Sequence, residues 1–178
     1  DTEAFWQNYS YRHLLVLCGS QALAARVALQ ANQYMNENYK PQSHVPAEVP
    51  AALQQLRRRG LHLGVLSNRH NPFREELVTL GLSEFFPFAL AGGEVDLWKP
   101  SPDIFHYVAR QARLRPSQIA YVGDNYFADV IGARRAGLHA ILYDPHGIFP
   151  EPGCLVIKSF TELPGLIEKL KPCPGQQE

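Results

Sequence analysis

Acidic side chains that suit metal binding come directly after one apolar run of this chain. Asp124 and Asp129 follow residues 119–122. Such a run predicts a buried parallel strand, and in open α/β sheets ligands bind beyond the carboxyl ends of the strands. Mg²⁺ takes oxygen ligands and keeps some of its waters. The pattern therefore predicts a magnesium site formed by Asp124 and Asp129.

Two further polar clusters follow apolar runs in the same way. Ser67 and Asn68 end the run at residues 62–66, and Lys99 comes after the run at residues 88–91. A hydroxyl and backbone N–H groups can hold phosphate oxygens, and a lysine supplies a positive point charge for them. A metal at Asp124 would offset charge on a transferring phosphoryl group. The three clusters together predict phosphoryl-transfer chemistry.

Each cluster has a plainer interpretation when it is taken alone. Ser67 and Asn68 could be a turn that ends a strand, Lys99 a surface lysine, and Asp124 part of an ordinary turn. Asp129 could be a solvated acid in the first turn of a helix. The shared position of the clusters after successive strands favours the site over these alternatives.

The elements that must position these residues alternate regularly from Pro46 onward. Apolar runs predict strands at residues 62–66, 88–91, 119–122, 139–143 and 155–157, with amphipathic helices between them. Helix boundaries are marked by Asn71-Pro72, by Ser101 as an N-cap, and by a capping box of Ser159 and Glu162. This alternation predicts an α/β fold with a doubly wound parallel sheet over residues 46–178.

Residues 1–45 differ from the rest of the chain and predict a small helical unit. Ser20 is placed to cap a helix, and an earlier helix is expected around Trp6, Tyr9 and His13. Periodicity does not decide between helix and strand for residues 14–18. The expected inward stripe of the later helix consists of Leu23, Val27, Ala31 and Tyr34.

Composition excludes several classes of partner. Lysine plus arginine and aspartate plus glutamate number 17 each, so the charge predicts binding neither to nucleic acid nor to an anionic membrane. Cys18, Cys154 and Cys173 show neither disulfide nor zinc spacing, which favours a cytoplasmic location. No apolar stretch approaches a membrane span.

In this order and spacing, the motifs resemble those of the haloacid dehalogenase superfamily, in its phosphatase branch with a small helical cap. Residues 66–68 look like its second motif, 99–105 like its third and 122–129 like its fourth, and 132–137 look like the helix that follows. The resemblance implies a Rossmann-like core and makes residues 1–45 part of a cap inserted between the first two strands.

The same resemblance assigns roles to the site residues. Ser67 and the backbone of Asn68 would bind the phosphoryl group, and Lys99 would steady it against the nucleophile. Asp124 would ligate Mg²⁺, and Asp129 would do so through water or orient the site. The implied substrate is a small phosphorylated metabolite, whose identity stays open, as does the oligomeric state.

One part of the family pattern is absent from the sequence. The family nucleophile is the first aspartate of an Asp-x-Asp motif after the first strand, which is central in the sheet, and this chain contains no Asp-x-Asp. Asp1 is the only aspartate before Ser67. We therefore expect a piece of a longer phosphatase, inactive alone. The main alternative is a non-catalytic binding or regulatory protein with this fold. A metal-free dehalogenase is more remote because of Asp124.

Overall fold

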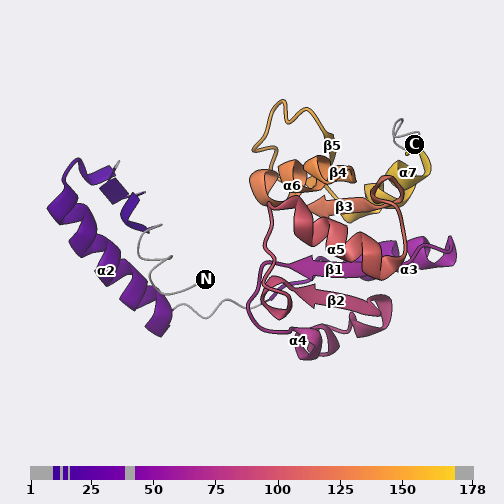
Figure 1. Ribbon diagram of the computed structural model, residues 1–178, viewed down its shortest axis with the longest axis horizontal. Helices are drawn as coiled ribbons and strands as arrows, with labels where there is room; N and C mark the ends of the chain where they lie inside the picture. Colours follow the sequence, from indigo (N-terminus) through magenta and orange to yellow (C-terminus); the bar gives the residue numbers. More distant parts are fainter. Residues whose placement is uncertain (1–9, 13, 16, 39–42, 171–178) are drawn as a thin grey trace. The chain divides into compact units, whose positions relative to one another are not determined.

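The computed structural model describes residues 10–12, 14–15, 17–38 and 43–170, which divide into two compact units (Figure 1). The units are Asp1–His44 and Val45–Glu178. No helix among these residues is both long and apolar enough to cross a membrane. The assignment of the first unit as a cap stays a prediction.

The first unit is helical wherever it is described up to residue 38, apart from the break at Gly19 and Ser20. Residues 10–12, 14–15 and 17–18 are helical, which settles the ambiguous run, and Trp6, Tyr9 and His13 lie outside the described residues. The expected cap of the next helix, α2 (Gln21–Asn38), is confirmed, since the Ser20 hydroxyl accepts from the backbone N–H of Leu23 at 3.4 Å.

The expected inward stripe of α2 is wrong in part. Leu23 and Tyr34 are exposed, whereas Ala24 and Ala28 are buried. Asn32 continues this spacing of four, and its side-chain oxygen accepts from the Ser10 hydroxyl at 3.0 Å. Small residues on this face suit a close approach of the preceding helical segment, which the hydrogen bond between Ser10 and Asn32 ties to α2.

The second unit alternates strands and helices as expected, and the predicted α/β fold is confirmed. Its main elements are α3 (Val49–Arg58), β1 (Gly64–Ser67), α4 (Arg74–Thr79), β2 (Phe88–Ala91), α5 (Pro102–Ala112), β3 (Ala120–Gly123), η4 (Tyr126–Ile131), α6 (Gly132–Arg135), β4 (His139–Tyr143), β5 (Leu155–Ile157) and α7 (Leu163–Glu168). Short 3₁₀ turns are η1 (Ser83–Phe85), η2 (Gly92–Glu94), η3 (Pro116–Gln118) and η5 (Phe160–Glu162).

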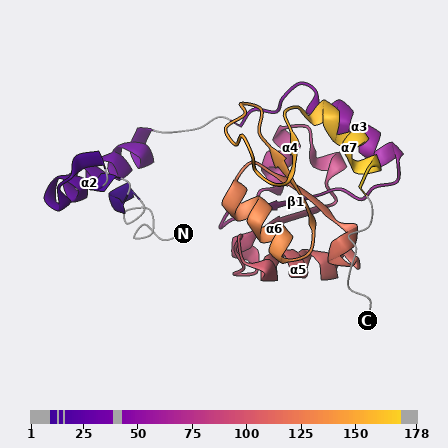
Figure 2. The ribbon, with the colours of Figure 1, turned by 90° about the horizontal axis from the view of Figure 1, so that it is seen from above.

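The strands form two parallel sheets with helices on both faces. β1 pairs with β2, while β3, β4 and β5 pair in that order. Helices α3, α4 and α7 lie on one side of the strands and α5 and α6 on the other (Figure 2). The cores follow these layers: Ile104 and Phe105 of α5 are fully buried on one side, and Leu53 and Leu56 of α3 are buried on the other.

Two helix starts differ from the expectation. The helix expected at Asn71-Pro72 begins at Arg74, after Phe73, whose side chain is buried in the core. The single helix expected after Gly123 is instead the π-helical turn η4 followed by α6. Asn125 caps η4, since its side-chain oxygen accepts from the backbone N–H of Ala128 at 2.8 Å.

The other helix starts agree with the sequence. The Ser101 hydroxyl accepts from the backbone N–H of Asp103 at 3.3 Å at the start of α5. At η5, the Ser159 hydroxyl accepts from Thr161 and the Glu162 carboxylate accepts from the Ser159 backbone at 3.0 Å. The capping box is thus formed, and the chain enters α7 directly after it.

Candidate active site at the carboxyl ends of the strands

The three sequence clusters follow the carboxyl ends of the three strands β1, β2 and β3. Ser67 is the last residue of β1, Lys99 follows β2 and the turn η2, and Asp124 follows the last residue of β3. Parallel strands bring these ends to the same side of the unit, so sequence positions far apart meet there.

Lys99 and Asp129 form a buried ion pair at the centre of this region. The ammonium nitrogen lies 2.6 Å from Asp129 Oδ1, and the two side chains are only 10% and 5% exposed. The other carboxylate oxygen of Asp129 accepts from the backbone N–H of Asn125 at 3.0 Å. Both oxygens of Asp129 therefore have partners within the chain, so its first role in this geometry is to hold Lys99.

Tyr121, which was not among the predicted site residues, joins this pair. Lys99 donates a hydrogen bond to the Tyr121 hydroxyl at 2.9 Å. The hydroxyl in turn can donate to the Leu66 carbonyl at 3.2 Å or to Asp129 Oδ1 at 3.5 Å. Burial raises the pKa of Tyr121 above its ordinary value of 10.0, and the charge of Asp129 adds to this rise. The phenol thus stays protonated and can donate.

A signal for Tyr121 is present in the sequence. It is a residue with a polar end inside an otherwise apolar strand, two positions before Gly123. A buried tyrosine hydroxyl needs a hydrogen-bond partner. Alternation along a strand, however, gives only the face of the sheet, so the identity of the partners required the structure.

Asn68 fixes the backbone of Lys99. Its side-chain nitrogen donates to the Lys99 carbonyl at 2.9 Å, and its side-chain oxygen accepts from the Lys99 backbone N–H at 2.9 Å. This reciprocal pair ties the residue after β1 to the residue that carries the ammonium group. The predicted role for Asn68 concerned its backbone, whereas these two contacts are made by its side chain.

Gly123 allows the approach of Asp129 to β3. A Cβ at Gly123 would collide with the carboxylate of Asp129. Gly132 is equally confined, because a Cβ there would lie 2.7 Å from the ring of Phe105 and 3.1 Å from the backbone of Pro100. Close packing therefore requires glycine at both positions, against Asp129 at Gly123 and against α5 and Pro100 at Gly132.

Ser67 and Asp124 complete the set of predicted residues and differ from Lys99 and Asp129. Asp124 is exposed, and neither its carboxylate nor the Ser67 hydroxyl makes a hydrogen bond or ion pair with the residues that the structure describes. An exposed carboxylate without a partner at the strand ends suits a hard cation.

Asp124 and Asp129 fit an Mg²⁺ site completed by water and substrate better than a metal site in which every ligand is a protein side chain. Within the described part of the chain, no three His, Cys, Asp or Glu side chains group as a metal cage. Mg²⁺ needs only one or two carboxylates, since waters and substrate phosphate fill its other positions. The exposed carboxylate of Asp124 could serve as one such ligand. Asp129, with both oxygens engaged, is suited to an indirect contact through water.

Comparison with known proteins identifies relatives over much of the chain. A profile of haloacid dehalogenase-like hydrolases matches residues 3–137. A phosphoserine phosphatase of Thermus thermophilus is 42% identical over 105 residues, which is 58% of this chain and 42% of that protein. A glyceraldehyde 3-phosphate phosphatase of Methanopyrus kandleri is 33% identical over 126 residues, or 70% of this chain and 54% of that protein. The chain thus spans about half the length of these curated relatives.

Solved structures share the fold. A haloacid dehalogenase superfamily phosphatase of Thermococcus onnurineus has a TM-score of 0.68 at 20% identity, covering 95% of this chain and 91% of that one. A 2-haloacid dehalogenase of Pseudomonas syringae has a TM-score of 0.63 at 26% identity, covering 94% of this chain and 72% of that one. Because the family profile matches most of its length, this chain belongs to the haloacid dehalogenase-like hydrolases.

Proposed function

We propose that this chain provides the phosphoryl-binding half of an Mg²⁺-dependent phosphatase that acts on a small phosphorylated metabolite. The observation that carries the proposal is the buried ammonium of Lys99, held by Asp129 and Tyr121 at the strand ends that also present Ser67. A buried cation that is fixed in direction can stabilise the negative charge of a transferring phosphoryl group without reorganising during the reaction.

Lys99 keeps one donor for this task. An ammonium group has three N–H donors, and two of them are used by Asp129 and Tyr121. The third is available for a phosphoryl oxygen or for a carboxylate beside it. The Ser67 hydroxyl and the backbone N–H of Asn68 supply further donors at the end of β1.

Mg²⁺ would be held by Asp124, with Asp129 in contact through water or acting only on Lys99. When bound, the ion would neutralise part of the charge on the phosphoryl oxygens. The two acids thereby take different roles: Asp124 is exposed for the cation, while Asp129 is buried against the lysine.

The substrate class is supported by the names of relatives. The similar proteins of Thermus thermophilus and Methanopyrus kandleri are named phosphatases of phosphoserine and of glyceraldehyde 3-phosphate. A human relative, 29% identical over 128 residues, is named N-acylneuraminate-9-phosphatase. These names concern different small molecules, so they support a small phosphorylated metabolite and no particular one.

We propose that the nucleophile is supplied from outside residues 1–178. Hydrolysis through a phospho-aspartate needs a carboxylate that attacks phosphorus, the release of the alcohol with a proton, and water to cleave the acyl phosphate. The sequence contains no Asp-x-Asp for these steps. We therefore propose that residues 1–178 alone do not turn over. The same absence supports the second candidate, a binding or regulatory protein of this fold without catalysis.

Hydrolysis of p-nitrophenyl phosphate tests the proposal. The chain alone should be inactive with and without Mg²⁺, and a fusion that adds an apolar strand ending in Asp-x-Asp before residue 1 should gain Mg²⁺-dependent turnover. In the active fusion, Asp124→Asn should abolish the turnover that Mg²⁺ supports. Glu75→Gln, which changes an exposed acid of α4, should leave this turnover unchanged. A fusion that is folded by circular dichroism but inactive would favour the non-catalytic candidate.

A further inference from the structure

Exposed arginines gather where helices α5 and α6 end, and we call this surface the arginine face. Its members are Arg110, Arg113, Arg115, Arg134 and Arg135. Residues 104–123 and 130–143, which contain them, include no Asp, Glu or Lys. Because acidic and basic side chains are equal in number over the whole chain, this region has a local excess of positive charge.

Packing between α5, α6 and the turn η3 brings these arginines to one surface. Nε2 of His106 on α5 lies 3.2 Å from the carbonyl oxygen of Ala136, which follows Arg135. A Cβ at Gly137 would lie 3.6 Å from the side chain of Pro116, which follows Arg115. Both helices also cover the same side of the strands (Figure 2). Arginines from two separate segments are therefore neighbours.

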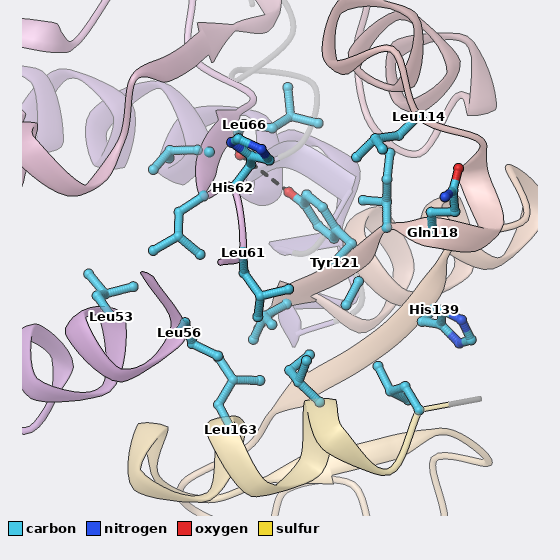
Figure 3. A pocket seen from close by; sticks show the side chains of 18 of the residues that line it. Leu53, Leu56, Leu61, His62, Leu66, Leu114, Gln118, Tyr121, His139 and Leu163 are labelled. Carbon is cyan, nitrogen blue, oxygen red and sulfur yellow. Dashed lines mark hydrogen bonds between the residues drawn. The ribbon is translucent and has the colours of Figure 1, made fainter. Parts of the chain in front are cut away.

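The arginine face lies at the amino ends of β3 and β4. The backbone N–H of His139 donates to the Ile119 carbonyl at 3.0 Å where these strands begin. Figure 3 shows the side chains of Gln118 and His139 on these neighbouring segments. The candidate active site lies at the opposite, carboxyl ends of the strands. The arginine face is thus separate from that site.

The charge of the arginine face is not balanced by the described part of the chain. Ion pairs of arginine with acids of the chain occur instead around α3, α4 and α7, as Arg57–Glu84, Arg59–Glu168 and Arg69–Glu76. On the arginine face, Arg134 donates to the Gly153 carbonyl at 3.3 Å, and no side chain has an acidic partner among the described residues. A carboxylate supplied from outside the chain would complete these groups.

Helix ends account for only part of this charge. Cations near a helix C-terminus interact favourably with the helix dipole, which suits Arg110 in the last turn of α5 and Arg134 in that of α6. Arg113 is different, because it is the C-cap of α5 with a φ of 56°. This left-handed conformation favours glycine. The backbone therefore gives no reason for an arginine there, and its side chain supplies one.

The residue types select among anionic partners. A guanidinium group binds a carboxylate through two parallel hydrogen bonds, whereas a lysine, which this region lacks, is a point charge. Single-stranded nucleic acid is held by aromatic side chains as well as cations, and a membrane surface by inserted apolar side chains. Among residues 104–123 and 130–143, Leu114 is the only exposed large hydrophobic residue. The surface therefore suits carboxylates best.

We propose that the arginine face is a docking surface for an acidic segment, rich in Asp and Glu, of a separate protein. Its carboxylates pair with the guanidinium groups that have no acidic partner in this chain, so charge complementarity fixes the position of the segment. Such a contact is reversible and sensitive to salt, because exposed ion pairs are screened by ions. The proposal does not depend on the phosphatase activity.

Binding of an acidic peptide tests the surface directly. The probe is a fluorescein-labelled decaglutamate peptide, followed by fluorescence anisotropy with the 178-residue chain. We expect saturable binding that weakens by about tenfold or more when the ionic strength rises from about 0.01 M to about 0.15 M, since the screening length falls from roughly 30 Å to roughly 8 Å. A decaglutamine peptide, which has no charge, should not bind.

Two charge-reversed double variants locate the binding surface. Arg113→Glu with Arg135→Glu changes the arginine face, whereas Arg26→Glu with Arg58→Glu changes the net charge equally at exposed positions of α2 and α3. The first should weaken peptide binding by about tenfold, and the second by no more than about twofold.

A further variant of the same surface guards against a failure to fold. Arg110→Glu with Arg115→Glu should weaken binding as much as the first double variant, and circular dichroism compares the folding of all the proteins.

Several results would overturn the proposal. They are the absence of saturable binding, or equal losses in the face variants and the control variant, which is also what an unfolded chain would give. Tighter binding of a decathymidine oligonucleotide would assign the surface to nucleic acid, and sedimentation with phosphatidylserine vesicles would assign it to a membrane. A dimer of the chain that Arg113→Glu with Arg135→Glu abolishes would assign it to a second copy.

Discussion

The buried pair of Lys99 and Asp129 makes a quantitative prediction about stability. The side chains are 10% and 5% exposed and lie 2.6 Å apart. Removing one partner of such a pair leaves an uncompensated buried charge, which costs about 3–5 kcal/mol. A domain of this size has roughly 5–15 kcal/mol of unfolding free energy. Lys99→Met and Asp129→Asn should therefore each remove a large part of the unfolding free energy. Each should also lower the midpoint of thermal unfolding by about 6–20 °C.

The double variant distinguishes the pair from two separate contributions. With both charges removed, no buried charge is left without a partner, so the loss should be smaller than the sum of the single losses by about 2–3 kcal/mol. Urea unfolding at pH 7 without Mg²⁺, followed by circular dichroism, measures all four proteins. Leaving Mg²⁺ out keeps metal binding from contributing to the difference.

A second ion pair is the matched control. Arg57 and Glu84 lie 3.3 Å apart, but their side chains are 46% and 71% exposed. The corresponding cycle with Arg57→Met and Glu84→Gln should give a coupling of only about 0–1 kcal/mol, because water screens the pair. Additive losses for Lys99 and Asp129, or a coupling no larger than in the control, would refute the reasoning about the buried pair.

Three further predictions concern the surroundings of this pair and one distant loop. Tyr121→Phe should cost about 1–3 kcal/mol in urea unfolding; because burial raises the pKa of Tyr121 above 10.0, this advantage of the wild type should be full below pH 10 and shrink as the pH rises further. Gly123→Ala should destabilise the chain by roughly 1–3 kcal/mol, since the new methyl group meets the Asp129 carboxylate. Gly165→Ala in α7, where nothing lies within 4 Å of the new methyl group, should be neutral or stabilising. Equal unfolding midpoints for the two variants would contradict the packing argument. Backbone N–H groups of the loop after β4 lower the pKa of Asp144 below 3.8 in the folded state. The stability advantage of the wild type over Asp144→Asn should therefore be full above pH 3.8 and disappear as the pH falls through the pKa of the folded state. Unfolding measured across an acid pH series checks this.

The sequence alone determined the order and type of the elements in the second unit. The strands at β1 to β5 follow from apolar runs between turn residues, and the start of α5 follows from Ser101 with Pro102. These signals are local, because a strand end or a helix cap depends on residues a few positions apart. The motifs around Ser67, Lys99 and Asp124 identified the family for the same reason.

Only the tertiary structure decided which polar groups meet. Lys99 and Asp129 are separated by 30 positions in the chain, and Tyr121 and Leu66 by 55. Their contacts depend on how the helices bring the strands together, which periodicity does not encode. The different environments of Asp124 and Asp129 also arise here, since one carboxylate is exposed and the other buried.

The buried face of α2 and the pairing of the strands are decided in the same way. Leucine and tyrosine were expected to face inward on α2, but the buried residues are Ala24 and Ala28, at the same spacing of four as Asn32, which binds Ser10 of the preceding helical segment. Each strand was predicted by its own residues, yet which strands pair depends on residues distant in the chain. Local propensity specifies an element, whereas burial and pairing depend on every element that surrounds it.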